Sequence, residues 1–143
     1  MTMSVGYTDE QIREFFVTLP HAAALGLTGE RVGDGQAVMS MPWSERLVGD
    51  PASGVVHGGA VSALMDTCCG AAAMSHPQVS GAGATLGLRI DYMRPATPGQ
   101  TIRAEAICHH LTRTVAFVRA VAVDEDESRP VATATGTFTV AGA

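Results

Sequence analysis

The aspartate at position 66 has the most unusual surroundings of any residue in this sequence. It lies within a stretch from Gly58 to Ser75 that is rich in alanine and methionine and has no other charged residue. This composition favours a helix, and apolar residues on nearly every side favour burial of that helix. A carboxylate there must be paired, hydrogen-bonded or placed at a cavity, because burying it alone is costly. From this chemistry alone, a structural and a catalytic role for Asp66 are equally good interpretations.

The residues one helical turn before and after Asp66 are all small. Ser62, Ala63, Cys69 and Gly70 stand three or four positions away and share its face of the predicted helix. The sheet, a partner helix or a ligand can therefore approach the carboxylate closely. This feature tips the interpretation of Asp66 towards a functional role.

The second candidate is the sequence His57-Gly58-Gly59, which begins the same predicted helix. The first N–H groups of a helix have no internal partner, and the helix dipole favours negative charge there. Two glycines let a substrate oxygen come close to the backbone, which is how an oxyanion site is built. The alternative is a tight turn that glycine permits, with His57 merely packing beside it.

Gly58 and Asp66 are too far apart to act on one carbonyl within one chain. They are eight positions apart, which is about 12 Å along a helix axis at ~1.5 Å per residue. If both act on one substrate, the aspartate must come from a second copy of the chain. A two-fold dimer would then have two equivalent sites.

The rest of the sequence predicts the elements that position these residues. Thr8 and Gln11 have the spacing of a capping box before a helix that reaches Pro20. Further along, we expect a short turn over 20–25, a hairpin over 27–33 and 36–42, an irregular segment over 43–56 and a loop over 76–83. From residue 84 onward, apolar and polar residues alternate in four segments separated by turn signals, which predicts four strands. The fold class is therefore α+β, with one antiparallel sheet curled around a buried central helix.

Composition narrows the class of protein. A chain of 143 residues fits one domain, and a net charge of −5 argues against nucleic-acid binding. Cys68, Cys69 and Cys108 lack the spacing of a disulfide framework or a zinc site, so we expect reduced thiols and a cytoplasmic protein. We see neither a signal peptide nor a membrane span in the sequence.

The motif A-S-G-x-x-H-G-G-x-x-x-x-L-x-D-x-x-x-G, over residues 52–70, is followed by a strand sequence that ends in Tyr-x-x-Pro at residues 92–95. Together they resemble the hotdog-fold acyl-CoA thioesterases of the phenylacetate-degradation (PaaI-like) type, and the resemblance covers roughly residues 25–140. It implies a long central helix wrapped by a six-stranded antiparallel sheet. We expect a single hotdog domain over 1–143, with a helical extension over 1–20. The resemblance further implies homodimers joined edge to edge, which often pair into tetramers.

The resemblance also implies a role for each motif residue. Asp66 matches the catalytic acid residue, acting as nucleophile or general base. Gly58 matches the residue whose backbone N–H polarises the thioester carbonyl, and Gly59 beside it is expected to contact the substrate. His57 matches the histidine that helps to fix the substrate carbonyl and the loop. Thr85 matches a serine or threonine that helps to position the attacking water.

Arginine supplies every basic side chain of this sequence, and residues 84–119 hold five arginines against two carboxylates. Guanidinium groups suit the phosphates of coenzyme A. Arg113 is the best candidate, because relatives carry a basic residue near the nucleotide at this turn; most of the others are expected to be ordinary solvent-facing strand residues. The acidic run over 124–127 is expected to be solvated. Where relatives have an asparagine upstream of the motif, this chain has Asp50 and Pro51.

These observations predict an acyl-CoA thioesterase that hydrolyses an acyl- or aryl-acyl-CoA to the free acid and coenzyme A. We expect no metal or redox cofactor, and as partners the acyl-CoA and a second copy of the chain, with neither nucleic acid nor membrane. Two alternatives stay open: a non-catalytic acyl-CoA-binding hotdog protein, and a hotdog hydratase or dehydratase. Intact Asp66 and Thr85 count against the first. The second usually pairs its aspartate with a histidine five residues later, and here no histidine follows Asp66 until His76.

Overall fold

A six-stranded antiparallel sheet forms the body of the computed structural model, which describes residues 7–81 and 83–142. The strand order is β1-β2-β7-β8-β9-β6, so that β1 and β6 are the two edges. The strands are β1 (Thr28–Gly33), β2 (Gln36–Met41), β6 (Thr85–Tyr92), β7 (Ile102–Leu111), β8 (Val115–Val123) and β9 (Ala132–Thr139). The predicted hairpin followed by four longer strands is confirmed, and so is the predicted α+β class.

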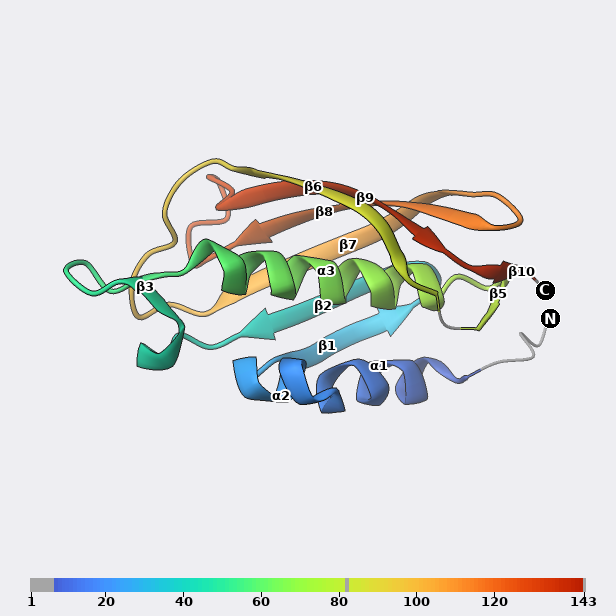
Figure 1. Ribbon diagram of the computed structural model, residues 1–143, viewed down its shortest axis with the longest axis horizontal. Helices are drawn as coiled ribbons and strands as arrows, with labels where there is room; N and C mark the ends of the chain where they lie inside the picture. Colours follow the sequence, from blue (N-terminus) through green and yellow to red (C-terminus); the bar gives the residue numbers. More distant parts are fainter. Residues whose placement is uncertain (1–6, 82, 143) are drawn as a thin grey trace.

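One long helix, α3 (Gly58–Met74), lies along one face of this sheet (Figure 1). Its central side chains, among them Leu64, Met65 and Cys68, have no exposed surface. The strand residues that form the rest of the core are mostly alanines, including Ala37, Ala104, Ala116, Ala122 and Ala132. Because the alanine side chains are small, the helix backbone can lie close to the sheet. The larger side chains of the helix then fill the space between helix and sheet. The prediction of a buried central helix is confirmed.

The N-terminal segment forms two helices, α1 (Asp9–Thr18) and α2 (Pro20–Leu25). The capping box is present, with the Thr8 hydroxyl accepting from the Gln11 N–H and the Gln11 side chain accepting from the Thr8 N–H. The short turn predicted over 20–25 was wrong, because Pro20 stands at the first helical position and Gly26 ends the helix at φ 73°. Of the helical extension predicted over 1–20, residues 1–6 lie outside the described residues.

Four short strands and one 3-10 turn complete the chain. They are η1 (Glu45–Leu47), β3 (Val48–Asp50), β4 (Val55–Val56), β5 (Val79–Gly81) and β10 (Ala141–Gly142), and they form the pairs β3–β4 and β5–β10. The irregular segment predicted over 43–56 and the loop over 76–83 therefore contain paired strands. Strands of two or three residues are too short to show an alternating pattern. In the part of the chain that the structure describes, no helix is long and apolar enough to cross a membrane.

Candidate active site

His57 caps the N-terminus of α3. Its Nδ1 atom accepts a hydrogen bond from the Gly59 N–H at 2.8 Å, and the backbone N–H of His57 donates to the Leu47 carbonyl at 2.7 Å. A Cβ at position 59 would lie 2.8 Å from the His57 Nδ1 atom, so only glycine allows this approach. Because Nδ1 accepts, the neutral ring carries its proton on Nε2, which is free to donate to a ligand. The predicted position of His57 and Gly59 at the helix start is confirmed.

Gly58 presents the first N–H of α3 at the protein surface. Within residues 7–81 and 83–142, no acceptor hydrogen-bonds to this N–H. The Gly58 carbonyl accepts from the Tyr92 hydroxyl at 2.8 Å, and the Tyr92 ring lies 3.4 to 3.7 Å from where a Cβ on Gly58 would be. Tyr92 is the last residue of β6, so the end of that strand holds the peptide group between Gly58 and Gly59, directly after the Gly58 N–H. The sequence motif contained Tyr92, but its contact with Gly58 was not predicted.

Asp66 lies in the third turn of α3 and is half-buried. The Thr85 hydroxyl donates to its Oδ1 atom at 2.8 Å. Both side chains line a cavity of about 150 Å³ between α1, α3 and β9. The structure therefore brings the two predicted residues together and places the carboxylate at a cavity, one of the three environments that its chemistry allows.

A β-bulge at the start of β6 directs Thr85 towards Asp66. Thr85 pairs with Phe138 and Gly87 with Thr137, so that two residues on β6 oppose one residue on β9. Leu88 packs against the core from the inner face, and strict alternation from it would turn Thr85 to the outer face. The extra residue reverses that orientation, which is a known use of bulges beside functional sites.

Within one chain, the start of α3 at Gly58 and its middle at Asp66 face separate spaces. Gly58 lines a cavity of about 470 Å³ with Val61, Tyr92 and Arg94. No residue is common to the linings of this cavity and the Asp66 cavity among the described residues. The helix is continuous from Gly58 to Met74, so the separation of about 12 Å along its axis stands.

Arg113 lies at the tip of the hairpin between β7 and β8 and is exposed. The neighbouring Thr114 carbonyl accepts from the Val140 N–H at 3.0 Å, and Val140 lines the Asp66 cavity. The turn predicted at Arg113 is confirmed, and it lies at the Asp66 end of the sheet. Asp50, in contrast, uses its carboxylate within its own turn, where it accepts from Ser53 and from the Ala52 N–H.

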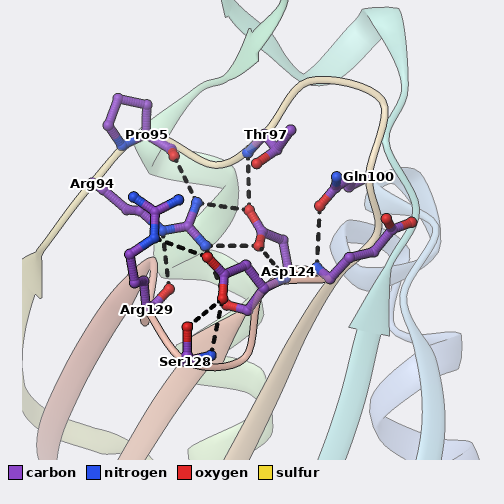
Figure 2. A network of polar contacts seen from close by, with 9 residues as sticks. Arg94, Pro95, Thr97, Gln100, Asp124, Ser128 and Arg129 are labelled. Atoms are coloured by element: carbon purple, nitrogen blue, oxygen red, sulfur yellow. Dashed lines mark hydrogen bonds and ion pairs between the residues drawn. The ribbon is translucent and has the colours of Figure 1, made fainter.

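Beyond Tyr92, a buried ion pair fixes the chain to the loop between β8 and β9 (Figure 2). The Asp124 side chain is 0% exposed, and the Arg94 guanidinium donates to its two oxygens at 2.8 and 2.7 Å. The N–H groups of Thr97 and Asp126 donate to the same carboxylate. The Arg94 guanidinium, helped by these N–H groups, holds the pKa of Asp124 well below its usual range. The expectation that residues 124–127 are simply solvated was wrong at Asp124.

Arg94 is also the centre of a wider set of contacts to the backbone. Its side chain donates to the carbonyls of Arg129 at 2.9 Å and Pro95 at 3.1 Å, as Figure 2 shows. The N–H of Met93 donates to the Val131 carbonyl at 2.8 Å. Sequence patterns did not predict this network, because its two halves are about thirty residues apart. It holds the end of β6 in the position from which Tyr92 reaches Gly58.

The cysteines are packing residues. Cys68 and Cys69 have no exposed surface, and burial raises the pKa of both thiols, that of Cys69 to about 12. A thiol that stays protonated is a poor nucleophile, so neither cysteine competes with Asp66. No group of three or more metal-ligating side chains is present in the described residues.

Comparison with known proteins decides the family. Residues 53–131, which include the α3 motif and Thr85, match the sequence profile of the Thioesterase superfamily. The chain belongs to this superfamily. As a member of it, the protein is a thioester hydrolase, and its helix-wrapping sheet is the hotdog fold of thioesterases. The predicted family and fold are confirmed.

The alignments of this thioesterase with individual relatives cover most of the chain. It is 30% identical to the medium/long-chain acyl-CoA thioesterase YigI of Salmonella typhimurium, in an alignment that covers 96% of this chain and 99% of that protein. A solved structure from Pseudomonas aeruginosa is 39% identical, with a TM-score of 0.81 over 91% of this chain and 96% of its own. A variant of the phenylacetic acid degradation protein PaaI of Thermus thermophilus is 31% identical, with a TM-score of 0.74 over 85% and 98%.

Proposed function

We propose that this thioester hydrolase acts on acyl-CoA, and that each active site combines Asp66 and Thr85 of one chain with Gly58 of a second. The observation that carries the proposal is the Asp66–Thr85 pair, a carboxylate and a hydroxyl at 2.8 Å that line an otherwise largely apolar cavity. A thioester hydrolase needs these two elements, a base beside a space for the acyl group. The similarity to a protein named acyl-CoA thioesterase supports coenzyme A as the thiol.

The chemistry follows from the atoms that the start and the middle of α3 present. The Gly58 N–H, together with the Nε2–H of His57, donates to the thioester oxygen and stabilises the negative charge that develops there. Asp66 either removes a proton from the attacking water or attacks the carbonyl carbon itself, and Thr85 holds it in place. The C–S bond breaks, and the sulfur leaves as the thiol once it has taken a proton. In the second route, water then hydrolyses the anhydride formed on Asp66.

The uncovered edge of the sheet supports a site shared between two chains. The β6 edge carries exposed apolar side chains: Leu86 is 59% exposed, Tyr92 53% and Met93 60%. An exposed apolar edge strand is a template for pairing with another strand. At the other edge, α1 packs against β1, with Arg13 in contact with Gly29. We therefore assign the β6 edge to a second copy of this chain.

Antiparallel pairing of β6 with itself brings the two halves of the site together. In a two-fold antiparallel pair centred between Leu88 and Arg89, the first residue of one β6 lies opposite the last residue of the other. Thr85 would then lie beside Tyr92 of the partner subunit. Since Thr85 binds Asp66 and Tyr92 binds Gly58, Asp66 would approach Gly58 of the partner subunit. One substrate carbonyl could then reach both.

Arg113 completes the proposed substrate site as a ligand for the phosphates of coenzyme A. It lies at the Asp66 end, is exposed, and makes no ion pair within the described residues. A guanidinium group binds phosphate through paired hydrogen bonds.

Release of the free thiol from a series of acyl-CoA thioesters tests the proposal. We expect turnover by the wild type and a loss of at least about 100-fold in Asp66→Asn, the usual scale for removal of an acid–base group. Asp34→Asn is the matched control, because Asp34 is exposed in the turn between β1 and β2 and lines neither cavity. No thiol release from any acyl-CoA would contradict the proposed substrate class, and near-normal turnover in Asp66→Asn would contradict the role of Asp66.

The same assay tests Arg113. We expect Arg113→Ala to raise KM for acyl-CoA by roughly ten- to a hundredfold, because this is the change in affinity that the loss of one charge-assisted hydrogen bond causes. An acyl thioester of a short thiol without the nucleotide should be unaffected. An equal effect on both substrates would mean that Arg113 supports the fold instead.

A further inference from the structure

The far wall of the Asp66 cavity comes from parts of the chain outside the superfamily match. Phe16 and Leu19, near the C-terminal end of α1 and just after it, close one side of the cavity, and Phe138 closes another. Asp66 and Thr85 lie inside residues 53–131, whereas these three apolar side chains lie outside them. The reacting groups are therefore part of the superfamily match, but the size of the space beside them depends on α1 and β9, which lie outside that match.

Phe16 meets α3 one turn beyond Asp66. If Gly70 carried a Cβ, it would lie 3.3 Å from the Cε1 atom of Phe16 and 3.9 Å from that of Phe138. Gly70 follows Asp66 by four residues and shares its face of the helix. The two aromatic rings therefore come together over a position where α3 has no side chain, directly along the cavity from the carboxylate.

The space between these side chains is small. Its volume is about 150 Å³, similar to that of an engineered apolar cavity of about 150 Å³ that holds one benzene molecule. Apart from Asp66 and the hydroxyls of Thr67, Thr85 and Thr139, its lining is apolar. Such a space suits an acyl group of up to about six carbon atoms, and the Phe16 ring stands where a longer chain would continue.

We propose that Phe16 determines acyl-chain specificity by ending the acyl cavity, so that short acyl groups are hydrolysed in preference to long ones. This inference rests on the proposed acyl-CoA thioesterase function. Phe16 contacts the acyl group and none of the reacting atoms. Each additional methylene that can be buried strengthens binding roughly fourfold, and one that clashes with the ring gains nothing.

The test measures kcat/KM for straight-chain acyl-CoA thioesters from two to sixteen carbons. For the wild type, we expect kcat/KM to rise to about six carbons and then to fall. Phe16→Ala should move the maximum to longer chains and raise kcat/KM for the twelve-carbon substrate by about tenfold or more. Val17→Ala is the matched control, because Val17 follows Phe16 on α1 but lies against Gly29 of β1 and does not line the cavity. Its profile should equal that of the wild type.

A reciprocal variant keeps the test decisive if Phe16→Ala does not fold. Gly70→Ala adds one methyl group against the Phe16 ring and should move the maximum to shorter chains. A wild-type profile that rises steadily to sixteen carbons, or an active enzyme whose profile neither variant shifts, would overturn the role of Phe16 and leave the proposed function intact. Absence of thiol release from every acyl-CoA, by the wild type as well, would instead contradict the proposed function.

Discussion

Strand β6 is held in two different ways at its two ends. Beyond Tyr92, the buried Arg94–Asp124 ion pair and several backbone hydrogen bonds attach the chain to the loop between β8 and β9. At Thr85 the strand begins with a bulge. Ala84, just before it, exchanges hydrogen bonds with Thr139, and one side-chain hydrogen bond joins Thr85 to Asp66 beside a cavity. The first end is fixed through buried charge. The second is open to a ligand.

This difference suits the two tasks that we assign to the two ends. A backbone N–H that stabilises developing charge is most effective when its orientation is set before the reaction begins, so Gly58 benefits from a rigid frame. A carboxylate that exchanges a proton or forms a bond must remain reachable by water and substrate. If β6 pairs with β6 of the partner subunit, the rigid end of one β6 lies beside the open end of the other.

The largest expected effect in this comparison is on stability, at the rigid end. Asp124→Asn leaves the Arg94 charge buried without its partner and should lower the free energy of unfolding at pH 7 by about 3–5 kcal/mol. Because folding lowers the pKa of Asp124, the Asp124 carboxylate contributes fully to the free energy of unfolding above about pH 4. This contribution is lost as the pH falls through the folded-state pKa. The advantage of the wild type should therefore persist from pH 7 to pH 5 and shrink in stronger acid. Urea unfolding at several pH values measures this difference. Equal stability of the wild type and Asp124→Asn at pH 7 would contradict the claim that the ion pair holds this end of β6 rigidly.

At the open end, we expect a smaller effect that falls on turnover. Thr85→Val removes a hydrogen bond to a charged group, worth about 1.5–3 kcal/mol, or roughly ten- to a hundredfold in kcat. Thr85→Ser keeps the hydroxyl and should retain most of the activity. Steady-state kinetics with one short acyl-CoA compares the two variants. If Thr85→Val kept its activity while Thr85→Ser lost it, the Thr85 methyl group rather than its hydroxyl would be what matters.

The smallest effect is expected where the rigid end meets the substrate. Tyr92→Phe removes a hydrogen bond between neutral groups, the one to the Gly58 carbonyl, and should lower kcat by about two- to tenfold. The fold should be unaffected, since the Arg94–Asp124 pair remains. A stopped assay with the same substrate is sufficient. A loss larger than that of Thr85→Val would reverse the ranking of the two ends.

Local patterns in the sequence predicted the parts of the fold that depend on neighbours along the chain. The apolar run after His57 predicted α3, and the alternation after residue 84 predicted the four long strands. The turn over 33–35 predicted the first hairpin, where Asp34 and Gly35 have positive φ. Asp66 could be singled out because a carboxylate in an apolar helix is costly wherever that helix packs.

Most of the features that the sequence did not predict depend on contacts between distant segments. The bulge that turns Thr85 inward arises from pairing with β9, and alternation within β6 gives no sign of it. Asp124 stands in an acidic run and looks solvated until Arg94, thirty residues earlier in the chain, is brought against it. Phe16 meets Gly70 only because α1 folds back beside α3. Residues 20–25 are helical although a turn was expected, since Pro20 can begin a helix as readily as a turn.

The most direct test of the shared site is complementation between two inactive variants. One chain carries Asp66→Asn, and the other carries Gly58→Val, whose side chain lies against the Tyr92 ring and obstructs the N–H. Each variant alone should be inactive. Random exchange makes half of the dimers mixed, and each mixed dimer has one intact site of two, so the mixture should recover about a quarter of wild-type activity. No recovery, with exchange of subunits confirmed by native mass spectrometry, would contradict a site shared between two chains.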